Sequence, residues 1–303
     1  MPSIRCIVAA TDFSSFSERA VQRAARIAQQ QDAELHLLHV VRPLDLYPSL
    51  MLAPDKLSHD VFSQHDQVLR EAEHTRLDDL ASSLAGQFGV RIRAVTRLGR
   101  AHTEIAAYAQ AASADLLVAG SRGESTLLDL FLGSTASRLL RLASCPVLIV
   151  RNPADEPYRQ VLAAVDFSPV SAAVVAHALS LAAGAPVETL HVLGSEVEQR
   201  LRKAKYVDVD LTDWITRLRT EADKQLEILL SGIEEGATTD RQVQPGSPPA
   251  VICQRIEERH TDLVVLGRHG HGRDMQEWLL GSVSKDVAQA AACDVLVIGP
   301  EEK

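Results

Sequence analysis

Short apolar runs alternate with longer stretches of mixed apolar and polar residues, in the order expected when strands and helices follow one another. Residues 4–10 are apolar and rich in β-branched side chains, which is typical of a parallel strand covered on both faces. Ser15 and Glu18 then form a capping-box pattern, which predicts that a helix begins there. Strands separated by helices predict a parallel, doubly wound sheet with right-handed crossovers.

The same pattern continues to residue 150 and completes one unit. Residues 90–95 alternate apolar with charged side chains, as expected of a half-exposed edge strand. The other predicted elements are strands at residues 34–41, 115–119 and 147–150, a helix with Leu77, Leu80 and Leu84 on one face, and helices after Gly99 and Gly133.

The second half of the chain repeats the first. Five pairs of segments match in order, at separations between 147 and 154 residues: Val8–Ser14 and Leu162–Ser168, Leu38–Val40 and Leu190–Val192, Asp115–Val118 and Asp262–Val265, Gly133–Ser134 and Gly281–Ser282, and Cys145–Val150 and Cys293–Ile298. We therefore expect two tandem Rossmann-like α/β domains, residues 1–152 and 158–303, each with a five-stranded parallel sheet and helices on both faces. In the second copy, Ser168 is the expected N-cap and Pro169 the expected first helical residue.

The net charge of the chain argues against some classes of binding partner. The 303 residues carry a formal net charge of −9, and the 31 Lys and Arg are dispersed, which argues against nucleic acids and anionic membranes as partners. No apolar run is long enough to cross a bilayer, and no signal-peptide pattern opens the chain. The four scattered cysteines show no metal-ligand spacing. We expect a cytoplasmic protein with reduced thiols.

Candidate ligand-binding residues follow the predicted strands, at the edge where open α/β sheets bind their ligands. Asp12 ends the first strand, so its carboxylate could accept hydrogen bonds from ribose hydroxyls or an adenine amine. Val40 ends the second strand, where its backbone N–H and C=O could form hydrogen bonds with the edge of an adenine base. These two positions predict a nucleoside-binding end of the site.

A group of glycines and hydroxyls predicts a phosphate-binding end. Gly120 and Gly123 follow the fourth strand, where glycines let the backbone approach a phosphate closely. Gly133 opens a helix whose N-terminus favours anions, and Ser134 and Thr135 add hydroxyl donors. Three basic residues lie where they could meet phosphates, although lone basic residues on loops are often only solvated: Arg122, Arg268 and His269.

The glycine spacing resembles the signature of the universal stress protein family, in its ATP-binding branch: Gly120, two residues, Gly123, nine residues, then Gly133 and Ser134. The segment Ala10–Ser14 also resembles the family's first strand and turn. The resemblance covers both halves of the chain and implies an adenine nucleotide alpha hydrolase-like fold. It implies binding of ATP, with or without Mg²⁺, or of AMP or ADP, with weak hydrolysis at most. It also implies dimerisation, which a tandem chain could satisfy as an intramolecular pseudo-dimer, and two such chains could pair again.

The second copy keeps most of this pattern. The matching residues are Asp166, Val192, Gly267, Gly270, Gly281 and Ser282. Ten residues separate Gly270 from Gly281, where the family has nine, and the extra residue falls within residues 271–274. A bulge could absorb it, or it could shift the phosphate-binding loop, so we expect weaker binding at this second site.

The leading interpretation is a tandem universal stress protein that binds an adenine nucleotide and acts as a non-catalytic stress-response regulator. The first alternative is a nucleotide-independent protein-interaction scaffold, because glycines after strands are often simple turn residues and Asp12 alone could cap a helix. The second alternative is a slow ATPase. The sequence holds no P-loop run and no Gly-x-Ser-x-Gly elbow, which argues against a P-loop NTPase and an α/β-hydrolase.

The histidines offer little support for a metal site. His36 and His39 are three residues apart on a predicted strand, so their side chains point to opposite faces and cannot share a metal ion. His39 and its counterpart His191 are expected to be hydrogen-bonded residues at the core or its rim. The spacing of His269 and His271 would allow them to share a metal ion. The simpler interpretation is that both lie on a solvated loop.

Overall fold

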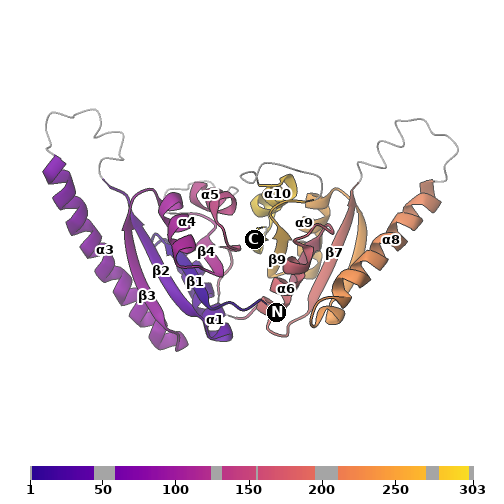
Figure 1. The fold of residues 1–303 in the computed structure, drawn as a ribbon, viewed down its shortest axis with the longest axis horizontal. Helices are drawn as coiled ribbons and strands as arrows, with labels where there is room; N and C mark the ends of the chain where they lie inside the picture. The colour runs from indigo at the N-terminus through magenta and orange to yellow at the C-terminus, as the bar shows by residue number, and fades with distance from the viewer. Residues whose placement is uncertain are drawn as a thin grey trace. The chain divides into compact units, whose positions relative to one another are not determined.

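The computed structural model describes residues 2–43, 59–123, 132–154, 156–194, 211–270 and 280–299. The chain divides into two compact units, Ser3–Ala154 and Asp155–Lys303, the second also taking in Met1–Pro2. Each unit is a parallel sheet with helices on both faces (Figure 1), which confirms the predicted fold class.

The first unit orders its strands β3-β2-β1-β4-β5, and every neighbouring pair is parallel. Its strands are β1 (Cys6–Thr11), β2 (Glu34–Val41), β3 (Ile92–Leu98), β4 (Leu116–Gly120) and β5 (Val147–Val150). Its helices are α1 (Ser15–Gln31), α3 (His59–Phe88), α4 (Ala101–Ala111) and α5 (Ser134–Leu142). The chain runs from β1 to β2 and β3 on one side, then crosses from β3 to β4 on the other side of β1. The carboxyl ends of β1 and β4 therefore form the switch point at which such sheets bind ligands.

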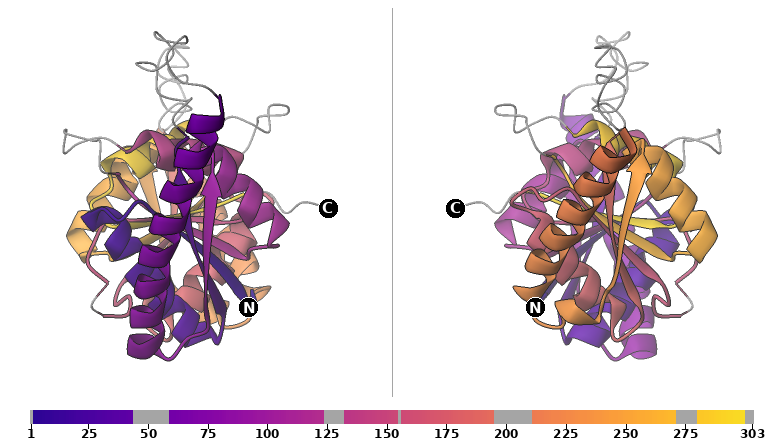
Figure 2. Two further views of the ribbon diagram at one scale, coloured as in Figure 1. Left: turned by 90° about the vertical axis from the view of Figure 1, so that its left-hand side faces the viewer. Right: turned by 90° about the vertical axis from the view of Figure 1, so that its right-hand side faces the viewer.

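The helices of the first unit cover both faces of its sheet. Helices α1 and α3 contact each other on one face, and α4 and α5 contact each other on the other face. Helix α3 runs along the edge strand β3, as the left view of Figure 2 shows. The central strands are apolar on both sides, and Ile7, Leu35 and Leu117 are fully buried. This double burial explains their nearly continuous apolar sequence.

The second unit repeats the architecture with the order β10-β9-β6-β7-β8, again with parallel pairs. Its strands are β6 (Val161–Val165), β7 (Val187–Gly194), β8 (Asp240–Gly246), β9 (Leu263–Gly267) and β10 (Asp294–Ile298). Its helices are α6 (Ser171–Ala182), α8 (Leu211–Ser231), α9 (Pro248–Arg259) and α10 (Ser282–Ala290), and a short 3-10 turn η3 spans Gly236–Thr238.

Two predicted helix starts are wrong in detail. In α1 the N-cap is Ser14, not Ser15: the Ser14 side chain accepts a hydrogen bond from the backbone N–H of Ser17 at 3.3 Å. In α6 the helix begins at Ser171 rather than at Pro169. The N–H of Ser171 donates to the carbonyl of Ser168 at 2.9 Å, so Pro169 occupies a tight turn before the helix.

The two units fill one interior position with different chemistry. In the first unit, His36 on β2 lies 3.0 Å from the hydroxyl of Tyr108 on α4. In the second unit, the equivalent positions hold Glu188 on β7 and Arg255 on α9, joined by hydrogen bonds of 2.6 and 2.9 Å. Arg259 adds a further ion pair to Glu188 at 3.2 Å. One unit therefore joins strand to helix through a histidine–tyrosine hydrogen bond, and the other through a buried salt bridge.

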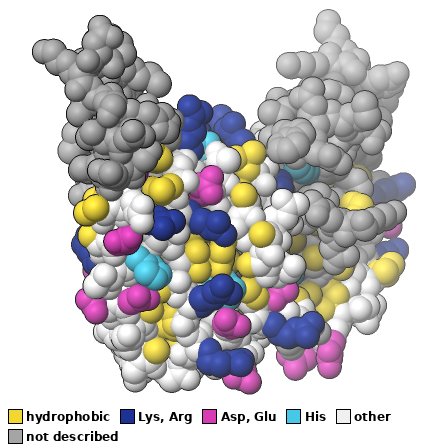
Figure 3. Space-filling model, turned by 60° about the vertical axis from the view of Figure 1, so that its left-hand side comes forward, with side chains coloured by type: hydrophobic (Ala, Val, Ile, Leu, Met, Phe, Trp, Pro, Cys, Tyr) yellow, Lys and Arg dark blue, Asp and Glu magenta, His cyan; other side chains and the backbone are white. Residues whose placement is uncertain are grey.

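The structure also bears on membrane spans and on surface charge. Among the helices that the structure describes, none is both long and apolar enough to cross a bilayer. On the face drawn in Figure 3, basic and acidic side chains of the described residues are interspersed. This agrees with the dispersed lysines and arginines of the sequence.

Candidate nucleotide-binding site

A cavity of about 280 Å³ opens in the first unit at the carboxyl ends of β1, β2 and β4. All seven residues predicted for this unit line it: Asp12, Val40, Gly120, Gly123, Gly133, Ser134 and Thr135. The structure therefore brings together residues that are more than a hundred positions apart in the chain. Their binding of a ligand stays a prediction.

Two glycines of this cavity lie very close to their neighbours. A Cβ atom on Gly120 would lie 2.9 Å from the backbone carbonyl of Phe16, at the start of α1. A Cβ atom on Gly123 would lie 2.5 Å from Oδ2 of Asp12. The loop after β4 therefore packs against the Asp12 carboxylate, and the backbone itself forms that part of the cavity wall.

The start of α5 faces the same cavity. Gly133 is its N-cap, and the Gly133 N–H donates to the carbonyl of Ser121 at 2.8 Å, which ties the glycine loop to the helix. The next backbone N–H groups, beginning with those of Ser134 and Thr135, belong to the first turn and have no intrahelical acceptor. These N–H groups, the two hydroxyls and the helix dipole suit an anionic group.

Asp12 takes part in the turn between β1 and α1. Its Oδ1 accepts hydrogen bonds from the N–H of Ser14 at 3.1 Å and from the Ser14 hydroxyl at 2.5 Å. This leaves Oδ2 on the side of Gly123 and the cavity. The carboxylate thus supports the helix cap with one oxygen and can accept a ligand's hydrogen bond with the other.

The residue after Asp12 is held in a rare conformation. Phe13 has a φ of +60°, in the left-handed region that bulky residues avoid. Its ring lies 4.7 Å from the ring of His39 on β2, and Arg76 from α3 covers it at 4.0 Å. Nδ1 of His39 is 2.8 Å from the carbonyl oxygen of Thr11, so the histidine is hydrogen-bonded as predicted.

The second unit repeats this arrangement. Phe167 has a φ of +63°, its ring lies 4.3 Å from that of His191, and Nδ1 of His191 is 2.9 Å from the Val165 carbonyl oxygen. Burial lowers the pKa of His191, while the hydrogen bond to Val165 and the charge of Asp166 oppose that shift. The ring is therefore held neutral, with its Nδ1 proton donated to the strand.

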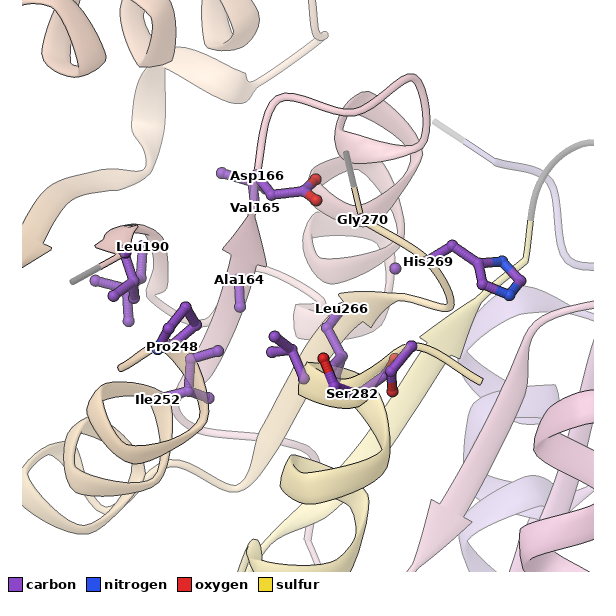
Figure 4. A pocket seen from close by; sticks show the side chains of 16 residues that line it. Ala164, Val165, Asp166, Leu190, Pro248, Ile252, Leu266, His269, Gly270 and Ser282 are labelled. Carbon is purple, nitrogen blue, oxygen red and sulfur yellow. The ribbon is translucent and has the colours of Figure 1, made fainter. Parts of the chain in front are cut away.

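The cavity of the second unit is larger, at about 430 Å³. All six residues predicted for it line the cavity: Asp166, Val192, Gly267, Gly270, Gly281 and Ser282. Figure 4 shows an apolar end formed by Leu190, Pro248 and Ile252, and a polar end near Gly270 and Ser282. The extra residue of the second glycine motif lies in residues 271–274, outside the described residues.

The three basic residues predicted near phosphates occupy different places. Arg122 lines the first cavity with its guanidinium 5.3 Å from the ring of Phe16. His269 lines the second cavity, and its ring points away from Leu190 (Figure 4). Arg268 is buried and lies against Gly299, where a Cβ would be 3.1 Å from its guanidinium. Arg268 is absent from the cavity lining that the described residues form.

The described residues include no group of three or more histidine, cysteine, aspartate or glutamate side chains that could hold a metal ion. His36 and His39 bond to Tyr108 and to the Thr11 carbonyl respectively, on opposite faces of β2. His271 lies outside the described residues, so its predicted pairing with His269 has no structural counterpart to compare.

A family model described as "Universal stress protein family" matches residues 3–151 and again residues 157–299. The chain belongs to the universal stress protein family. It carries two family units in tandem, as the internal repeat of the sequence predicted.

Similar proteins extend over the whole chain. A universal stress protein of Mycolicibacterium smegmatis is 30% identical over an alignment of 307 positions, which covers 97% of each chain. A universal stress protein of Mycobacterium tuberculosis is 27% identical, covering 96% of this chain and 94% of the relative. The solved structure of a universal stress protein from Archaeoglobus fulgidus is 20% identical with a TM-score of 0.68, covering 97% and 98% of the two chains, and shows the shared fold.

In both universal stress protein units, the structure adds lining residues that the sequence analysis missed. The start of α4 contributes Ala101 and Ile105 to the first cavity, and Pro248 and Ile252 occupy the matching places in the second. These residues follow Gly99 and Gly246, whose φ values of +147° and +145° require glycine. That repeated glycine before a helix is the signal that could have identified them.

Proposed function

We propose that this universal stress protein binds adenine nucleotides, ATP foremost, and acts as a non-catalytic regulator in a stress response. The observation that carries the proposal is the convergence of Asp12, the close-packed glycine loop and the start of α5 on one cavity. In this arrangement Oδ2 of Asp12 binds the ribose, and the α5 start with Ser134 and Thr135 binds the phosphates. The apolar lining at Val40 and Ile105 covers the adenine.

The proposed non-catalytic role follows from the lining of the first cavity. Among the described residues, its ionisable side chains are Asp12 and Arg122. Oδ1 of Asp12 is engaged by Ser14, and an arginine does not act as a proton carrier at neutral pH. Activation of water for hydrolysis calls for a general base, so we expect bound ATP to persist as a signal.

The proposal includes a cytoplasmic location, where ATP is at hand and the four free cysteines stay reduced. Pairing of the two units as a pseudo-dimer, and of two chains with each other, stays a prediction. The domain limits 1–152 and 158–303 likewise stay predictions, and separate expression of each segment tests whether it folds alone.

A calorimetric titration of ATP with Mg²⁺ into the nucleotide-free protein tests the proposal. The variants Ser134→Asp and Ser282→Asp each place a carboxylate at the first residue of a helix, where it stabilises the helix but repels phosphate. We expect each to weaken ATP binding at its own cavity by about tenfold or more. Ser82→Asp, on the exposed side of α3, adds the same charge away from both cavities and should bind like the wild type.

The other outcomes point to other functions. Absence of ATP binding in the wild type, confirmed by equilibrium dialysis, would replace the proposal with the protein-interaction scaffold. Phosphate release that Ser134→Asp abolishes and Ser82→Asp preserves would make the protein a slow ATPase.

A further inference from the structure

The two cavities have a similar backbone arrangement, but the charged residues of the two units differ. Arg122 lines the first cavity, and it and three further arginines of the first unit stand where the second unit has other residues. The equivalent pairs are Arg42 and Gly194, Arg100 and Ser247, Arg122 and His269, and Arg138 and Asp286. Arginine carries a permanent charge, which the substitutions at these positions remove or replace. Lys285, which stands where the first unit has Ser137, offsets Asp286.

Two ionisable side chains, one in each unit, have charged neighbours of opposite sign. At the start of α4, burial and then the charges of Arg138 and Arg100 lower the pKa of His102. On α9 of the second unit, burial and then the charges of Glu257 and Asp286 raise the pKa of Cys253. Burial is the larger cause of each shift, and the charged neighbours add to it: arginines beside His102 and carboxylates beside Cys253.

The hydroxyl groups at the helix starts differ in the same direction. Thr135 of α5 offers a hydroxyl to the first cavity, and Val283 holds the matching place in α10. Ser284 does not make up the difference, because its hydroxyl is buried and lies within hydrogen-bond distance of the carbonyl oxygens of Arg268, at 2.8 Å, and Gly281, at 3.2 Å. Ser282 thus remains the second cavity's counterpart to the Ser134 and Thr135 pair.

The apolar end of the second cavity is correspondingly larger. Val165 stands where the first cavity has Thr11, and Leu190 and Leu266 join the lining. The cavity volume rises from about 280 to about 430 Å³. The second cavity therefore suits a ligand with more apolar surface and less charge than the first.

From these differences we propose that the two units have divided ligand recognition between them. The first cavity takes a nucleoside di- or triphosphate, whose negative charge Arg122 and the α5 start balance. The second cavity takes an adenine nucleoside with at most one phosphate, which the α10 start and Ser282 accommodate. This inference rests on the proposed function and specifies the ligand class of each site.

Separate measurement of the two sites needs variants that fill one cavity at a time. Ala10 and Ala164 occupy equivalent places on β1 and β6, and each lines its cavity. Ala164→Phe fills the second cavity and leaves the first to report, and Ala10→Phe does the reverse. Titration of each with ATP, AMP and adenosine, with Mg²⁺ present, then gives a ratio of dissociation constants for each site.

We expect the Ala164→Phe protein to bind ATP about tenfold or more tightly than AMP, because each charge-assisted contact to an added phosphate contributes roughly that factor. We expect the Ala10→Phe protein to bind AMP and adenosine at least as tightly as ATP. The same preference in both proteins, or no adenosine or AMP binding by the Ala10→Phe protein, would overturn the inference. If the Ala164→Phe protein binds no adenine nucleotide while folded, the proposed function itself fails.

A charge exchange tests the assignment in the intact chain. The double variant His269→Arg with Asp286→Arg changes exposed or half-buried positions and restores two of the first unit's charges to the second. It should raise the affinity of the second site for ATP relative to AMP by about fivefold or more. An unchanged ratio would show that these residues do not set the preference, whether or not the filled variants fold.

Discussion

Substitution of Gly123 by alanine isolates the contribution of Asp12 to nucleotide binding. The new Cβ would lie 2.5 Å from Oδ2 of Asp12 and 3.7 Å from its Cγ. The carboxylate can rotate, whereas backbone cannot, so the main chain keeps its path and the Asp12 side chain moves. That rotation takes Oδ2 away from the cavity and weakens the hydrogen bonds that Ser14 donates to Oδ1.

The expected magnitudes separate binding from stability. A hydrogen bond to a charged group contributes about 1.5–3 kcal/mol, so loss of the Asp12 contact weakens ATP binding by about 10- to 100-fold. The weakened cap costs about 1 kcal/mol of unfolding free energy, which a domain stable by about 5–15 kcal/mol tolerates. Gly123→Ala should therefore be folded and defective in binding.

Gly120→Ala is the matched control, because its Cβ would meet backbone. The carbonyl carbon and oxygen of Phe16 would both lie 2.9 Å away, and neither can rotate aside. We expect a loss of about 1–3 kcal/mol in unfolding free energy. Calorimetric titration with ATP and urea denaturation of both variants are the assay. A folded Gly123→Ala protein with an unchanged dissociation constant for ATP would refute the assignment of Asp12 as a ligand.

Three further predictions concern stability. The pKa of His191 is lowered in the folded chain, so the neutral ring stabilises the fold fully above about pH 6.5, and this contribution is lost as the pH falls through the folded pKa. His191→Gln should therefore flatten the dependence of the unfolding free energy on pH between pH 5 and pH 7, by up to about 1.4 kcal/mol per unit of pKa shift. Glu188→Ala leaves Arg255 without its buried partner and should cost about 3 kcal/mol in urea denaturation, where a loss below about 1 kcal/mol would contradict a structural role for the pair. Gly86 is exposed within α3, and an added Cβ would meet nothing within 4 Å outside the helix's own backbone. Gly86→Ala should therefore raise the unfolding free energy by about 0.5–1 kcal/mol, and a lower melting temperature would contradict the helical assignment there.

The apolar pattern predicted the fold well because each buried strand corresponds to its own run of apolar residues in the sequence. The strands at residues 34–41 and 147–150 were placed with the bounds that the structure shows. The edge strand was placed two or three residues early, since only one of its faces is covered and its alternation fades gradually into the flanking residues. The glycine spacing placed every predicted site residue around one of the two cavities, because the motif follows a strand end.

The sequence pattern failed where side chains from distant segments decide the local conformation. The cap at Ser14 depends on the left-handed turn at Phe13, which is held by a ring on a different strand. No local propensity favours a phenylalanine there, so the pattern pointed to Ser15 instead.

The exchange of His36 and Tyr108 for Glu188 and Arg255 affects how the repeat can evolve. Recombination between the two halves of the gene tends to make duplicated segments alike. A crossover between strand and helix would set a buried glutamate beside tyrosine, or a histidine beside two arginines, and leave a charge without its partner. Such hybrids would be destabilised, so the mismatch disfavours the exchange of these segments between the two halves.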